Sequence, residues 1–231
     1  MKKILIVWAN AKISNKFINT YINKYKFYNT FKNKENLIHY KNNIKNFILD
    51  LNSIESIKIF LQKVKKESFS WVLLFSSIYR KDNFEDIDWM LESLNVNIIN
   101  IIYLIEKLIE NWNIADNSKI ILFKDAWTKQ PKDWYIWYSI AKNIIWNILP
   151  SLSIKHNNII FLWIDMGPVY TEKIGSEKDI FYNKPLIKLD NPLSWLINFL
   201  SFLLHEENFF STWSIIDFSW WTYLIRKNQK W

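Results

Sequence analysis

The chain has 231 residues, of which 50% are hydrophobic and 23% charged, so its length and composition predict one well-filled core and exclude a disordered protein. Cysteine is absent, which excludes disulfides, thiolate metal sites and a cysteine nucleophile, and the scattered His39, His156 and His205 do not form a histidine metal motif. The net charge of +8 comes almost entirely from lysine, because Arg80 and Arg226 are the only arginines; it predicts a lysine-rich surface rather than a nucleic-acid-binding one.

Seven short apolar runs have the length of strands buried on both faces. In chain order they are 4–7, 27–31, 47–49, 72–75, 119–123, 159–164 and 214–218. Apolar residues at helical spacing lie between them, over 13–22, 54–64, 96–109, 138–149 and 192–204. Strands that alternate with helices predict a parallel sheet covered on both faces. We therefore expect a single α/β domain over residues 1–231, a three-layer α/β/α sandwich with a doubly wound, Rossmann-type parallel sheet.

The N-terminal apolar run, Ile4–Val7, follows two lysines but is too short for a secretory signal, and no small-residue cleavage site follows it. The longest apolar stretch, Trp195–Leu204, contains Asn198 and Ser201 and is too short to span a bilayer. We expect a cytoplasmic protein without a membrane partner.

Glycine and tryptophan occur in unusual amounts, with 2 glycines and 14 tryptophans. Together they make up the roughly 7% that glycine alone takes in average proteins. We hypothesise that the gene uses UGA for glycine and that the printed chain follows a translation table in which UGA means tryptophan. The alternative is a protein that is genuinely rich in tryptophan.

The segment after the first strand, Trp8–Ser14, has the position of a phosphate-binding turn, because ligands of doubly wound sheets bind beyond the carboxyl ends of the strands. Such a turn needs small residues, so that backbone N–H groups can approach a pyrophosphate. Trp8 would fill that space and glycine would open it, although the later glycines of such turns are missing. The candidate cofactor-binding residues here are Trp8, Asn10, Lys12 and Ile13.

Tyr138 and Lys142 are four residues apart and share one face of a predicted helix. A lysine ammonium close to a phenol lowers the pKa of the phenol, which can then pass a proton near neutral pH. Asp125 ends the preceding strand, thirteen residues before this tyrosine. Other pairs have the same spacing, but only Tyr138 opens a helix that follows a strand and a polar loop. These other pairs are Tyr28/Lys32, Tyr103/Lys107 and Tyr223/Lys227.

With these residues in place, the chain resembles the short-chain dehydrogenase/reductase family over nearly its whole length. Five features carry the resemblance, in the order expected for the family. They are Asp50-Leu51 after the third strand, Leu94-Asn95-Val96-Asn97, the pair Tyr138 and Lys142, the turn Gly167-Pro168-Val169-Tyr170-Thr171, and the closing strand with its flanks over 211–221.

The resemblance implies catalytic roles for three of these residues: Tyr138 would supply a proton, Lys142 would assist it and hold the ribose, and Asn97 would support a water-linked proton relay. It also implies a homodimer or homotetramer. Further cofactor contacts are implied at Asp50 and Leu51 beside the adenine, at Ser76 after the fourth strand, and at Pro168, Val169 and Thr171 around the nicotinamide carboxamide.

Several tryptophans stand where this family often carries glycine or another small residue, which supports the glycine hypothesis. They are Trp8, Trp137, Trp146, Trp163, Trp213, Trp220 and Trp221. If these tryptophans are real, the resemblance implies a blocked cofactor site.

Asp125 departs from the family pattern, because most members carry a catalytic serine there. An aspartate in this place resembles the pteridine-reducing branch, in which it assists protonation of a pterin ring nitrogen. Two further departures leave alternatives open. Phe75–Ile78 replaces the usual Asn-Asn-Ala-Gly, as in a scaffold protein that has lost its cofactor, and Tyr135 with Lys142 has the wider spacing of enoyl-carrier-protein reductases.

The residues near the end of the second strand bear on cofactor choice, because a basic residue there accepts the 2′-phosphate of NADP. Lys32 and Lys34 stand there with Glu35 as their acidic neighbour, which favours NADPH and leaves NADH open.

We predict an NAD(P)H-dependent reductase that transfers hydride to a C=N or C=O bond of a small molecule, with a pterin as one candidate and no metal. The alternatives are an enoyl- or 3-oxoacyl-carrier-protein reductase-like enzyme, a non-catalytic scaffold, and a nucleic-acid-binding protein.

Overall fold

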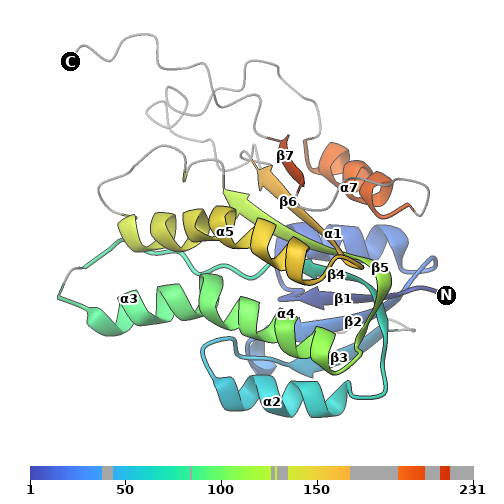
Figure 1. The fold of residues 1–231 in the computed structure, drawn as a ribbon, viewed down its shortest axis with the longest axis horizontal. Coiled ribbons are helices and arrows are strands. Elements are labelled where there is room, and N and C mark those ends of the chain that lie inside the picture. The colour runs from blue at the N-terminus through green and yellow to red at the C-terminus, as the bar shows by residue number, and fades with distance from the viewer. Residues whose placement is uncertain are drawn as a thin grey trace, which may run out of the picture.

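The structure is a computed structural model that describes residues 1–37, 44–83, 85–125, 128, 135–166, 192–205 and 214–218. Within these residues the chain forms one seven-stranded sheet in the order β3-β2-β1-β4-β5-β6-β7, and every neighbouring pair of strands is parallel (Figure 1). The strands are β1 (Lys3–Val7), β2 (Lys26–Phe31), β3 (Ile44–Ile48), β4 (Phe69–Leu74), β5 (Ile114–Asp125), β6 (Ile160–Met166) and β7 (Ser214–Phe218).

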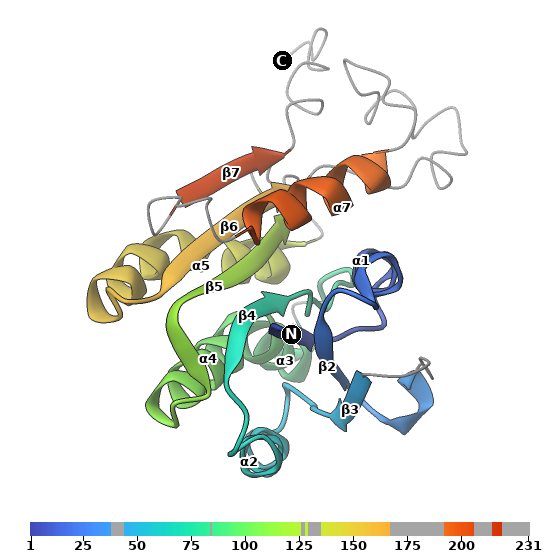
Figure 2. The ribbon, with the colours of Figure 1, turned by 90° about the vertical axis from the view of Figure 1, so that its right-hand side faces the viewer.

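Helices cover both faces of the sheet, as Figure 2 shows: α1 and α7 lie on one side, and α2, α4 and α5 on the other. The helices are α1 (Lys12–Tyr21), α2 (Ile54–Lys63), α3 (Ile87–Leu94), α4 (Asn100–Glu110), α5 (Ile136–Lys155) and α7 (Pro192–Leu203), with a 3-10 turn η1 (Lys34–Asn36) and a π-helical segment η2 (Asn95–Ile99). The expected three-layer α/β/α arrangement and Rossmann-type topology are confirmed.

The core forms because side chains alternate along each strand between the two helical layers. On β5, Ile120 and Leu122 belong to the cluster beneath α4 and α5, whereas Ile121 and Phe123 belong to the cluster beneath α1 and α7. All four side chains are buried. A strand that is apolar on both faces therefore reads as a continuous apolar run, which explains why such runs located the strands in the sequence.

The expected helix over 96–109 is longer and less regular than its apolar pattern suggested. It begins at Ile87, where Asp86 caps α3 by accepting a hydrogen bond from the Trp89 N–H at 2.8 Å. Residues 95–99 then form η2 before α4 continues. A π-helical turn inside a helix is frequently a functional feature, and this one contains Asn97.

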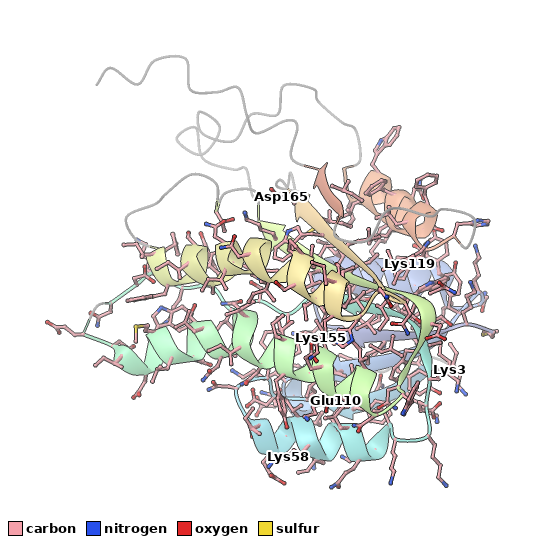
Figure 3. The ribbon with its side chains drawn as sticks, in the orientation of Figure 1. Lys3, Lys58, Glu110, Lys119, Lys155 and Asp165 are labelled. Atoms are coloured by element: carbon pink, nitrogen blue, oxygen red, sulfur yellow. The ribbon has the colours of Figure 1, made fainter. Side chains whose placement is uncertain are left out.

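Lys119 anchors α7 to the sheet, and Figure 3 labels it. Its side chain is buried, and its Nζ donates to the carbonyl oxygens of Leu203 and His205, both at 2.7 Å. These carbonyls belong to the end of α7, where backbone oxygens lack partners within the helix and carry the negative end of the helix dipole. A buried lysine on β5 thus replaces water at the end of a helix more than 80 residues away in sequence.

Glu67 connects β1, β2 and β3 on the side of the sheet where the strands begin. It accepts hydrogen bonds from Lys3 Nζ at 2.8 Å, Lys45 Nζ at 2.7 Å and the Tyr28 hydroxyl at 2.6 Å. Burial alone would raise the pKa of this carboxyl, but the hydrogen bonds outweigh burial and lower the pKa from 4.5 to about 2. Burial and the hydrogen bond to Glu67 raise the pKa of Tyr28.

We expect this cluster to make the fold sensitive to acid. Because the pKa of Glu67 is lower in the folded chain than the unfolded value of 4.5, its contribution to stability is present above pH 4.5 and is lost as the pH falls towards 2. The loss should be on the order of 1–2 kcal/mol after solvent screening. Urea unfolding at pH 7, 4 and 3 measures this effect. Between pH 7 and pH 3 the free energy of unfolding should fall less in Glu67→Gln than in the unchanged chain. Glu110→Gln, which removes an exposed ion pair with Lys107, is the control. An equal fall in the free energy of unfolding in all three proteins would contradict the role of Glu67 in acid sensitivity.

Candidate functional site

The carboxyl ends of β1, β4, β5 and β6 lie at one edge of the sheet, beside η2 and the start of α5 (Figures 1 and 2). The chain leaves β1 for β2 and β3 on one side and then crosses over to β4 on the other. Ligands of doubly wound sheets bind at this switch point, because the loops separate there and leave a crevice. The predicted site residues that the structure describes lie around this edge.

Tyr138 and Lys142 are on consecutive turns of α5, and both side chains are buried. The Lys142 Nζ lies 6.0 Å from the centroid of the Tyr138 ring. The same ammonium donates to the carbonyl oxygen of Ser76 at 3.4 Å. A buried lysine is thereby held beside the ring of a buried tyrosine. The structure brings this predicted pair together with the loop that follows β4.

Aromatic contacts hold that loop against the start of α5. The ring of Tyr79 stacks on Tyr135 with centroids 4.3 Å apart and an interplanar angle of 9°. It also meets Tyr138 edge to face, with centroids 5.1 Å apart. The Tyr135 ring, which precedes α5, is therefore engaged with Tyr79, while Tyr138 is the tyrosine that shares the helix with Lys142.

Asp82 caps the N-terminus of α5. Its Oδ2 accepts hydrogen bonds from the N–H groups of Ile136 and Trp137, the latter at 3.4 Å. The first N–H groups of a helix have no partner within the helix, and a carboxylate there also complements the helix dipole. No local sequence pattern points to Asp82, because its partners lie 54 and 55 residues away.

Asn97 ties η2 to the loop after β4 through all the polar atoms of its buried side chain. Its Oδ1 accepts from the Ile78 N–H at 3.1 Å and the Ser77 hydroxyl at 3.3 Å. Its Nδ2 donates to the Ile78 carbonyl at 3.1 Å and the Ser93 hydroxyl at 3.3 Å. The amide therefore positions the loop that also receives Lys142, and a role in a proton relay stays a prediction.

The first turn lies against the ends of β2 and β3. Trp8 is buried, its N–H donates to the Thr30 hydroxyl at 3.1 Å, and its indole Nε1 donates to the Leu49 carbonyl at 3.2 Å. Asn10 and Lys12 are exposed, whereas Ile13 is buried beneath the start of α1. The residue that precedes α1, Ala11, has no side-chain group that could cap the helix, and the start of a helix is a place that suits a phosphate.

The other predicted cofactor residues surround the ends of β2 and β3. Lys32 Nζ lies 3.4 Å from Glu92 Oε1. Asp50 is half-buried just after β3, and its Oδ1 accepts a hydrogen bond from the Asn52 N–H at 2.9 Å. Leu51 is buried, and its carbonyl accepts from the Asn100 side chain at 2.6 Å.

Some predicted site residues lie outside the described parts. Pro168, Val169 and Thr171 are among them, and for Asp125 the structure describes the backbone at the end of β5 and not the side chain. Their roles stay predictions. Ser76, in contrast, is described and buried beside Lys142. Among the described residues, no three His, Asp or Glu side chains lie close enough to hold a metal ion.

Comparison with solved structures shows the fold family. A short chain dehydrogenase family protein from Francisella tularensis subsp. tularensis SCHU S4 is 19% identical, with a TM-score of 0.80 over 95% of this chain and 98% of that one. A short-chain dehydrogenase/reductase from Brucella melitensis is 16% identical, with a TM-score of 0.80 over 96% and 97%. A 4-hydroxyisoleucine dehydrogenase complexed with NADH is 18% identical, with a TM-score of 0.79 over 95% and 98%. No protein-family model and no curated protein matches the chain.

The chain therefore has the fold of the short-chain dehydrogenase/reductase family, and the resemblance found in the sequence is confirmed at the level of the fold. In the described part of the chain, no helix is both long enough and apolar enough to cross a bilayer.

Removing the cap on α5 should loosen the helix that carries Tyr138. We expect Asp82→Ala to lower the free energy of unfolding by about 0.5–2 kcal/mol and to increase amide hydrogen exchange in a peptide covering 136–142. Asp82→Asn keeps a hydrogen-bond acceptor at the same place, so its free energy of unfolding should fall less than that of Asp82→Ala. Urea unfolding and hydrogen exchange measure both effects, and unchanged exchange in Asp82→Ala would contradict the capping role.

Proposed function

We propose that the chain is an NAD(P)H-dependent reductase of the short-chain type. The observation that carries this proposal is the buried pair of Tyr138 and Lys142 at the carboxyl edge of the sheet, with the lysine held on the Ser76 carbonyl. Structures with this fold include the dehydrogenase complexed with NADH and the protein BdcA in complex with NADPH. The Lys142 ammonium fits a dinucleotide, whereas the buried Trp8 in the turn after β1 does not.

The residues of this chain would divide the chemistry as follows. The nicotinamide, when bound, supplies a hydride to the carbon of a C=N or C=O bond. Tyr138 delivers a proton to the nitrogen or oxygen of that bond, and the Lys142 ammonium stabilises the phenolate that remains. Asn97 holds the loop next to the reacting groups and supports proton supply through water. Asp125 would orient or protonate the substrate.

A pterin is the substrate class that Asp125 favours, because a carboxyl can assist protonation of a ring nitrogen where a serine hydroxyl would bind a carbonyl oxygen. An enoyl- or 3-oxoacyl-carrier-protein reductase is the second candidate, based on the spacing of Tyr135 and Lys142. The stacking of Tyr135 on Tyr79 and the burial of Tyr138 beside Lys142 favour Tyr138 as the proton donor over Tyr135.

We further propose that the chain works as a homodimer or homotetramer in the cytoplasm. Large apolar side chains are exposed on α3, η2 and α5, and burying them against a second copy would remove them from water. They include Leu91, Ile99, Ile140 and Ile144.

Tyr138→Phe should slow turnover strongly while nucleotide binding persists, because it removes only the hydroxyl. Loss of a positioned proton donor costs about 10²–10⁴-fold in rate. Oxidation of NADPH in the presence of dihydropterins and enoyl thioesters would be followed by absorbance, in the chain as printed and with glycine at position 8. Tyr103→Phe is the matched control, since Tyr103 also precedes a lysine by four residues but lies on α4. Full turnover in Tyr138→Phe would exclude the assignment, and a folded protein that binds neither NADPH nor NADH would favour a scaffold.

Lys32 should decide between the two nucleotides. Its ammonium lies at the end of β2, where a 2′-phosphate would replace Glu92 as its partner. We expect Lys32→Ala to weaken NADPH binding about 10-fold and to leave NADH binding unchanged, as measured by titration calorimetry. Lys34→Ala is the control. An equal loss of affinity for NADPH and NADH in Lys32→Ala would show that Lys32 does not bind the 2′-phosphate.

A further inference from the structure

A basic surface lies at the edge of the sheet where the strands begin, opposite the candidate site. Because parallel strands all begin at the same edge, the fold gathers lysines there from three separate segments, at the starts of β1, β2 and β3. We call it the amino-edge surface, and its members are Lys2, Lys3, Lys24, Lys26, Lys45 and Glu67. With five lysines and one carboxylate, it carries half of the chain's net charge of +8.

Three of these lysines gather around one carboxylate. Glu67 accepts hydrogen bonds from Lys3 Nζ at 2.8 Å and from Lys45 Nζ at 2.7 Å. The ammonium groups of Lys26 and Lys45 also lie 5.8 Å and 5.2 Å from the ring centroid of Tyr28, within the range of a cation–π attraction. One negative charge is thus shared among three positive charges, which are held in fixed places beside it.

The other two lysines lie over a pair of aromatic rings. Lys2 Nζ is 4.8 Å from the centroid of the Trp71 ring, and Lys24 Nζ is 5.3 Å from that of Tyr25. The two rings meet edge to face with centroids 5.0 Å apart. Lys2 precedes Lys3 in the chain and so connects the two halves of the amino-edge surface.

A cavity of about 270 Å³ opens beside Lys2 in the same part of the molecule. The register of β4 against β5 shifts here, so that residues 115–118 bulge away from β4. Lys2, Ser70 and Asp116 are among the residues that line the cavity, and Asp116 Oδ1 accepts from Asn158 Nδ2 at 2.5 Å. The ammonium of Lys2 and the hydroxyl of Ser70 can donate to a phosphate, whereas the carboxylate can accept from hydroxyl groups.

We propose that the amino-edge surface docks on an anionic lipid bilayer, with the phosphate of one headgroup in the cavity beside Lys2. Clusters of four to eight basic residues bind anionic leaflets in this way, through the negative surface potential. The expectation of no membrane partner rested on the lack of a segment that spans a bilayer, which peripheral binding does not need. The docking surface does not depend on the proposed reductase activity.

The amino-edge surface suits lipid headgroups better than a nucleic acid or a protein. The rings beneath its lysines are buried, since Tyr25 is 5%, Tyr28 0% and Trp71 4% exposed, so they are not available to stack on bases as in proteins that bind single strands. All five cations are lysines, which lack the planar fork that makes arginine the usual residue for nucleic-acid recognition. Protein interfaces have an apolar core, whereas the members of this surface are all charged.

Docking through this edge leaves the candidate active site facing away from the bilayer. Tyr138 and Lys142 lie at the carboxyl edge of the sheet, and the amino-edge surface lies where the strands begin. A small substrate in water can therefore reach the candidate site while the chain is bound to lipid.

Cosedimentation with vesicles tests the proposal on the unchanged chain. Vesicles of phosphatidylcholine with phosphatidylglycerol should bind the chain, and vesicles of phosphatidylcholine alone should not. Raising the salt concentration from about 0.1 M to about 1 M should weaken binding about 10-fold or more, because the Debye length falls from about 10 Å to about 3 Å. Equal binding to both kinds of vesicle, or none to the anionic kind, would overturn the proposal. So would binding to a labelled oligouridine that anionic vesicles do not displace.

A triple variant locates the contact. Lys24→Gln, Lys26→Gln and Lys45→Gln together should weaken binding to the anionic vesicles about 10–100-fold, because each lysine near an anionic leaflet contributes about 5-fold in affinity. Glutamine keeps much of the length of each side chain and removes its charge. Unchanged affinity in the triple variant would overturn the proposal.

The matched control removes the same charge elsewhere, with Lys16→Gln, Lys58→Gln and Lys107→Gln on α1, α2 and α4. It should bind the anionic vesicles as the unchanged chain does, and equal weakening in both triple variants would show a response to net charge alone and overturn the docking surface. Circular dichroism checks that each variant folds. If the first triple variant unfolds, Lys24→Glu alone, at an exposed position before β2, should still weaken binding about 10-fold or more, and unchanged affinity would overturn the proposal.

Discussion

The parallel pairing of all seven strands is the constraint on which the rest of the structure depends. Because every strand runs in the same direction, every connection must return across a face of the sheet, so both faces are covered and the strands are apolar on both sides. The same constraint gathers the carboxyl ends at one edge. The loops after β1 and β4, the end of β5 and the start of α5 meet there, which is why residues far apart in the sequence form one candidate site.

Long-range polar contacts hold this edge in place. Asp82 caps α5 from the loop after β4, Asn97 fastens that loop to η2, and Lys142 donates to the Ser76 carbonyl. The three contacts connect the same loop to two different helices, so the position of Tyr138 depends on each of them. Lys119 does the same for α7 on the other face, where a buried ammonium satisfies the last carbonyls of the helix.

The turn after β1 shows a conflict between side chain and backbone. Phosphate-binding turns of doubly wound sheets need a small residue at this place, and the left-handed backbone of position 8, with φ of 62°, independently favours glycine. The indole satisfies its own N–H on Leu49 and buries its rings, so the fold accommodates it. The fold therefore accommodates a bulky side chain at a position whose backbone suits glycine.

The sequence by itself determined the fold class, the seven strands, and the Tyr138 and Lys142 pair, because these depend on local patterns: continuous apolar runs, helical spacing, and two residues one helical turn apart. The early start of α3 also depends on a local cap, Asp86, whereas the π-helical turn at Asn97 has no side-chain cap and was not expected from the sequence. Only the tertiary structure decided that Asp82 caps α5, that Ser76 receives Lys142, and that the Trp8 indole reaches Leu49. Each of these contacts joins residues more than 40 positions apart, and no pattern within one segment can specify which distant segment will lie beside it.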